Sequence, residues 1–200
     1  MHTYKAENPL GNLFVHALKD VYFAENAIHR ALPKMIDSAG QKDLKAGLTA
    51  HRKETEGQIK RLEQIFEMMD IKVEAVTCEA IKGILKEGDD VLDKFGETSA
   101  ADAGIIFACQ AVEHYEINRY GTMKEWAHEL GMKDVEKLLS ATLDEERAAD
   151  KKLTKLAEES INMAAEGNGH AGKASKSAHG KSASKGEDMK SEKSTESRKG

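Results

Sequence analysis

Apolar residues recur at alternating steps of three and four along four long stretches of this chain. That spacing places them on one face of an α-helix. The stretches span about residues 8–40, 41–69, 99–130 and 133–165, and a shorter one, about 78–94, lies between the second and the third. Because the 200 residues include only two prolines, little interrupts such helices. The sequence therefore predicts an all-α protein.

The ends of the long stretches carry residues that are typical of helix caps. Asn8 is a good N-cap, and Pro9 suits the first helical position. Gly40 follows the first helix and Gly131 the third, where glycine is common after a C-cap. Ser99–Asp102 resembles a capping box, so we expect the third long helix to begin there.

The lengths of the connections predict the order in which the helices pack. Short turns at Gly40 and Gly131 make two antiparallel hairpins, and a longer segment joins the second helix to the third. That segment must cross over the bundle. We therefore predict a ferritin-like four-helix bundle with a short extra helix in the crossover.

Composition divides the chain into two parts. Residues 1–166 form the predicted bundle, since 40% hydrophobic and 5% aromatic content can bury one core but hardly two. Residues 167–200 are rich in Lys, Ser and Gly, with eight Lys or Arg against four acids. With Met189 as its only large apolar residue, this tail cannot offset the entropy cost of ordering. We expect it to be disordered.

The chain carries no sign of export or membrane insertion. No run of about 18 apolar residues occurs, and the N-terminus lacks a basic segment followed by an apolar one. Cys78 and Cys109 lack metal-like spacing, so we expect free thiols. These features predict a cytoplasmic protein with no membrane partner.

Acidic or polar residues interrupt each apolar seam near its midpoint. The candidate site residues are Glu25 in the first helix, His51 with Glu54 at the edge of the second, Glu113 and Glu116 in the third, and Glu146 in the fourth. Because the midpoints of packed antiparallel helices of similar length meet, we expect these side chains to converge at one level of the bundle.

Converging carboxylates require a compensating cation. Burying one unpaired carboxylate costs several kcal/mol, and mutual repulsion adds to this cost. No Arg or Lys occupies the matching seam positions. Two divalent metal ions per chain would neutralise the acids, and oxygen ligands with at most one imidazole favour iron or manganese over zinc. A single seam glutamate can instead face a water-filled gap, and His51 fits either a ligand or a residue that supports one.

Four phrases give the chain a resemblance to a known family. It resembles the YciE/YciF family of ferritin-like stress proteins over about residues 10–164. The resemblance implies a dimeric bundle, a rubrerythrin-like dinuclear metal centre and a role in bacterial stress response. The phrases are "DVYFAENAIHRALPKM", "HRKETEGQIKRLEQIFE", "CQAVEHYEINRYGTM" and "LLSATLDEERAADKKLTKLA".

The predicted ligand set departs from the wider di-iron pattern. That pattern has a Glu on two helices and Glu-x-x-His on the other two. Gly57 and Ala149 stand where its histidines would be. Instead, His51 precedes Glu54 by one turn, and Glu116 follows Glu113 by one turn. The metal and its reactivity therefore stay open.

The sequence is compatible with three functions. The first is a dinuclear metalloprotein that oxidises Fe(II) or consumes peroxide. The alternative is a non-catalytic dimeric bundle that acts as a structural or interaction protein. The third assigns the tail to weak, non-specific nucleic-acid contact; its acids and its lack of aromatic residues disfavour specific recognition.

Overall fold

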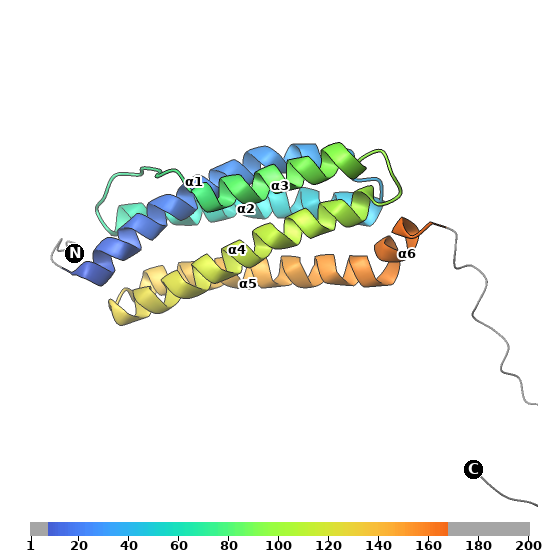
Figure 1. Ribbon diagram of the computed structural model, residues 1–200. Coiled ribbons are helices and arrows are strands. Elements are labelled where there is room, and N and C mark those ends of the chain that lie inside the picture. Colours follow the sequence, from blue (N-terminus) through green and yellow to red (C-terminus); the bar gives the residue numbers. More distant parts are fainter. Residues whose placement is uncertain (1–7, 168–200) are drawn as a thin grey trace, which may run out of the picture. The chain divides into compact units, whose positions relative to one another are not determined.

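The computed structural model describes residues 8–167, and the described part is helical throughout its regular structure (Figure 1). The predicted tail lies outside these residues, apart from Gly167. None of the helices within 8–167 is long and apolar enough to cross a membrane. The helices are α1 (Pro9–Ser38), α2 (Lys42–Met68), α3 (Glu79–Phe95), α4 (Ala101–Glu129), α5 (Lys133–Leu156), a π-helical turn (Ala157–Ile161) and α6 (Asn162–Ala165).

The predicted ferritin-like arrangement is confirmed. Helices α1 and α2 form one hairpin and α4 and α5 the other, with α2 packed on α5 and α1 on α4 (Figure 1). The short helix α3 lies in the connection between the hairpins and packs against α4 and α1. All four long helices thus surround one core.

Local sequence explains how the first helix begins and how the second hairpin turns. The Asn8 side chain accepts a hydrogen bond from the backbone N–H of Leu10 at 3.0 Å, as expected for an N-cap. Gly131 adopts a φ of +71°, a left-handed conformation that glycine adopts without strain. It therefore reverses the chain between α4 and α5.

The predicted capping box at Ser99–Asp102 is wrong. Helix α4 has Ala100 as its N-cap, and that residue makes no side-chain capping bond. The Asp102 carboxylate instead accepts hydrogen bonds from the backbone N–H groups of Gly40 and Gln41, at 2.8 and 2.9 Å. Ser99 donates to the Ala165 carbonyl at 3.0 Å. Tertiary packing has thus redirected both side chains to the ends of other helices.

The core consists of two apolar clusters with a polar layer between them. One cluster lies on the Met35 and Leu48 side of the layer, and the other lies on the Phe14 and Leu62 side. The buried residues of the polar layer are Glu25, His51, Thr55, Gln58, Glu113, Glu116, Thr142 and Glu146.

Candidate metal centre

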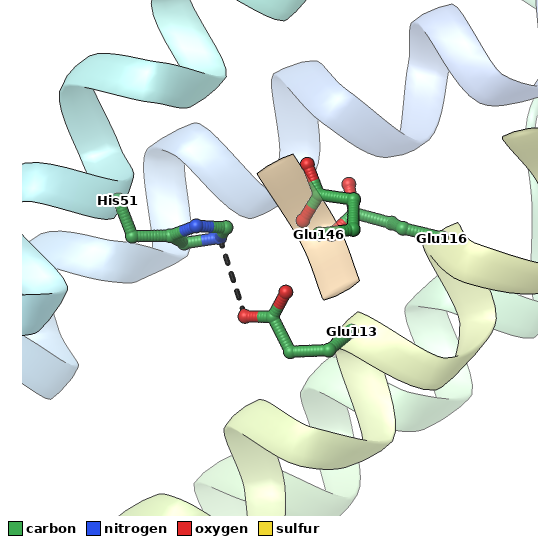
Figure 2. Close-up of side chains that lie close together, drawn as sticks. All are labelled: His51, Glu113, Glu116 and Glu146. Carbon is green, nitrogen blue, oxygen red and sulfur yellow. Dashed lines mark ion pairs between the residues drawn. The ribbon is translucent and has the colours of Figure 1, made fainter. Parts of the chain in front are cut away.

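Helices α2, α4 and α5 bring four potential ligands together. One ligand atom from each of His51, Glu113, Glu116 and Glu146 lies within 4.8 Å of the others. Figure 2 shows the imidazole and the three carboxylates converging from their helices. All four residues are buried, as the seam positions predict. The resulting group is compatible with a metal site.

Glu25 reaches the same layer from α1 and is fully buried. The Tyr120 hydroxyl donates a hydrogen bond to its Oε1 atom. Burial, with the charge of Glu146 adding to it, raises the pKa of Glu25 to about 8, even though the bonds with Tyr120 and Glu116 lower it. Helix α1 therefore also contributes a carboxyl group to the layer, and a tyrosine holds it in place.

Burial also changes the acidity of the other carboxyl groups. Burial, together with the hydrogen bond with Glu146 and that residue's charge, raises the pKa of Glu113 to about 11. Burial raises the pKa of Glu116 well above its usual range, with the charges of Glu25 and Glu146 adding to the effect. The pKa of Glu146 is raised by burial too. Without a metal ion, the layer therefore holds protons at neutral pH.

Several buried atoms of the layer accept or donate no hydrogen bond within residues 8–167. Orphaned polar atoms of this kind cost free energy, because they lose their bonds to water. A divalent cation bound by the carboxylates would satisfy their orphaned oxygen atoms, so the donor set fits a metal ion. The atoms are Oε2 of Glu25, Glu113, Glu116 and Glu146, Oε1 of Gln58, and Nδ1 of His51.

A second group of polar residues surrounds the carboxylates, and the sequence interpretation missed its role. Gln58 is fully buried and donates to Glu146 as well as to Glu145, the latter at 3.2 Å. Arg61 pairs with Glu145 and donates to Thr142 at 2.9 Å. Gln58 stands on the α2 seam, a signal that could have identified it. Arg61 lies off that seam, so periodicity gives no such signal.

Glu54 lies apart from the buried group. Its side chain is 49% exposed, and its Oε2 atom is 3.8 Å from Nδ1 of His51. The other ring nitrogen of His51, Nε2, lies 3.5 Å from Oε1 of Glu113 (Figure 2). The imidazole therefore stands between an exposed acid and the buried layer.

The sequence matches a family model over most of its length. The family is described as "Domain of unknown function (DUF892)", and its model matches residues 10–166. YciF from Escherichia coli strain K12 is 40% identical over 156 residues, which cover 78% of this chain and 94% of YciF. The chain belongs to the DUF892 family of YciF-like proteins. The resemblance found in the sequence is thereby confirmed.

Solved structures of DUF892-like relatives share the fold. The crystal structure of the E. coli stress protein YciF matches with a TM-score of 0.74 and 38% identity, covering 78% of this chain and 98% of that one. YcfI from Rhodopseudomonas palustris matches with a TM-score of 0.72 and 44% identity, covering 76% and 98%. The chain is thus a YciF-like helical protein of a family that includes a stress protein.

Proposed function

We propose that this DUF892 protein binds two divalent metal ions, iron or manganese, and acts in bacterial stress response. The observation that carries the proposal is the convergence of three buried carboxylates and one imidazole within 4.8 Å. Glu25 adds a fourth buried carboxyl group through its link to Glu116. Five groups are enough to bridge two ions and leave positions open.

The chemistry of the donor set supports iron or manganese. Carboxylate oxygens are hard ligands, and a single imidazole among them is typical of these ions more than of zinc. Bound redox-active ions would supply electrons to an oxidant, which suits the oxidation of Fe(II) or the consumption of peroxide. The protein would bind and orient the ions, and an apolar cluster flanks the layer on each side.

Metal content tests this proposal directly. Protein purified without a tag and reconstituted anaerobically with Fe(II) or Mn(II) should hold nearly two ions per chain, as measured by elemental analysis. Glu113→Leu should lose most of this metal, because it removes a carboxylate from the centre of the group. Glu67→Leu removes an exposed carboxylate of α2 and should bind metal normally. Less than about half an ion per wild-type chain would overturn the proposal.

A second candidate function is a non-catalytic dimeric bundle that serves as a structural or interaction protein. Its support is the raised pKa of the buried carboxyl groups, because a protonated layer can remain buried without any metal. Added metal would not increase the thermal stability of such a protein, whereas it would stabilise a metal-binding protein. Analytical ultracentrifugation would test the homodimer, which belongs to both candidate functions.

A further inference from the structure

A cavity of about 350 Å³ lies between α2 and α5 and reaches the buried layer. Its lining includes the exposed residues Ala50 and Ala148 as well as the buried residues His51 and Glu113. One continuous space therefore extends from the protein surface to two of the proposed ligands. The unpartnered atoms of those residues, Nδ1 of His51 and Oε2 of Glu113, belong to buried side chains at its inner end.

Small residues keep this cavity open. Gly47 and Ala50 line it from α2, and Ala148 and Ala149 line it from α5. A Cβ atom at Gly47 would meet the Lys152 side chain at 3.5 Å, so the lysine stem lies directly against this wall. Larger side chains at these four positions would narrow the space between the two helices.

Glu54 is the exposed acid of this cavity that contacts His51, whereas Glu113 contacts it from the buried end. Asp144 and Glu145 also line the cavity, but Asp144 lies 4.0 Å from Arg147, and Glu145 is held by Arg61 and Gln58. Glu54 is half exposed, and its carboxylate lies 3.8 Å from the unpartnered Nδ1 of His51. An exposed carboxylate next to an imidazole is a suitable first contact for a divalent cation.

On the opposite side of His51 and Glu113, residues 8–167 enclose a much smaller cavity. There, a cavity of about 30 Å³ is lined mainly by apolar side chains such as Leu32, Met35 and Val112. A hydrated cation would lose its water at these side chains without gaining ligands. The cavity between α2 and α5 is larger, and its lining carries the acids Glu54, Glu113, Asp144 and Glu145 against one lysine, Lys152.

We propose that the cavity between α2 and α5 is the passage by which divalent cations enter the layer, with Glu54 as the residue that captures them at its mouth. His51 then stands between the capturing carboxylate and Glu113. This inference rests on the proposed function, because it gives the proposed metal centre its route of loading. It makes Glu54 a residue that acts on the rate of loading and leaves the number of bound ions unchanged.

Stopped-flow mixing of the full-length apoprotein with Co(II), followed by the visible absorbance of the bound ion, measures this rate. Glu54→Gln should slow uptake by about threefold to tenfold at low salt, because a charge that attracts the cation is lost. The matched control is Glu56→Gln, since Glu56 is also half exposed and also contacts a histidine, His29, at 3.2 Å. That control should load at the wild-type rate.

Filling the passage gives a second and independent test. Ala149→Leu should slow uptake more than Glu54→Gln, because the larger side chain occupies the cavity. Ala50→Leu should also slow uptake, because it narrows the cavity from α2. Ala50 is exposed, so this substitution does not disturb the core. Ala141→Leu adds the same volume at an exposed position of α5 outside the lining of this cavity and should have no effect.

Equilibrium dialysis against Co(II) separates this inference from the proposed function. If wild-type protein binds two ions and the Glu54 and Ala149 variants reach the same content more slowly, the passage is supported. If these variants load at the wild-type rate, the passage is wrong while the metal centre stands. Loss of an ion at equilibrium in Glu54→Gln would overturn the capture role, because Glu54 would then be a permanent ligand. Failure of the wild-type chain to bind Co(II), Fe(II) or Mn(II) would overturn both.

Discussion

The apolar ends of the bundle and its polar middle are built on the same four seams but have opposite effects on stability. Val21 and Ile28, which flank Glu25 on α1, are as deeply buried as the glutamate. Burying the aliphatic side chains stabilises the fold, whereas burying the carboxyl group costs free energy. Equal burial therefore has opposite effects on the free energy of folding at neighbouring positions of one helix. The ends stabilise the fold, and the middle provides the candidate site at the expense of stability.

The largest expected loss of stability comes from truncating a side chain in one of the apolar clusters. Phe14→Ala should destabilise the protein by about 3–5 kcal/mol, because Phe14 is fully buried in one of the clusters. The matched control is Phe107→Ala, whose side chain is 56% exposed and should cost far less. Urea unfolding of both variants measures the difference. Similar losses of stability in both variants would show that burial of Phe14 in the apolar cluster does not account for its contribution to stability.

The second prediction concerns the replacement of a carboxyl group of the polar layer by an apolar side chain. Glu113→Leu should stabilise the metal-free protein by about 1–4 kcal/mol, because it replaces a buried carboxyl group with an aliphatic side chain. The loss of the contacts with His51 and Glu146 limits the gain. Glu113→Gln keeps the polar group and serves as the control, with little change expected. A Leu variant less stable than wild type in chelator would mean that Glu113 is a structural residue.

The third prediction concerns the dependence of stability on pH, which we expect to arise from the carboxyl groups of the polar layer and not from the apolar clusters. The folded-state pKa of Glu25 is raised from 4.5 to about 8, so the folded protein binds more protons than the unfolded chain between these values. Stability of the metal-free protein is therefore greatest at low pH in this range and is lost as pH rises through the folded pKa. Glu25 alone should account for about 2 kcal/mol between pH 5 and pH 7.

Urea unfolding in chelator at a series of pH values checks this slope. Glu25→Gln should flatten it, whereas Glu67→Gln, at an exposed position of α2, should leave it unchanged. Carboxylates with lowered pKa, such as Glu54, act only below their usual range and do not contribute above pH 5. Stability that is constant or rises from pH 5 to pH 8 would contradict the protonated layer.

The smallest expected effect lies outside both regions, at the turn between α1 and α2. Asp102→Ala should destabilise the protein by about 1 kcal/mol, because the backbone N–H groups of Gly40 and Gln41 lose their acceptor. Asp102→Asn retains one acceptor oxygen and should lose less. Thermal melts of the two variants check this order. An Asn variant as unstable as the Ala variant would show that charge, more than hydrogen bonding, matters at this position.

Helical periodicity was sufficient to predict the bundle and most of its polar layer. The all-α class, the two hairpins and the crossover helix follow from seam spacing, glycine positions and connection lengths. The buried positions of Glu25, Glu113, Glu116 and Glu146 follow from their places on the seams. Glu54, at the edge of its seam, lies half exposed beside His51, and its predicted role as a ligand stays a prediction.

The sequence by itself determined which face of each helix is buried and where carboxylates interrupt it, because a period of 3.6 residues relates spacing to direction. Tertiary structure decided what those side chains contact. The pairing of Arg61 with Glu145, the bond from Tyr120 to Glu25 and the use of Asp102 at the start of α2 join residues far apart in the chain. Such contacts depend on the rotation and axial position of one helix relative to another, which no pattern within a single helix specifies.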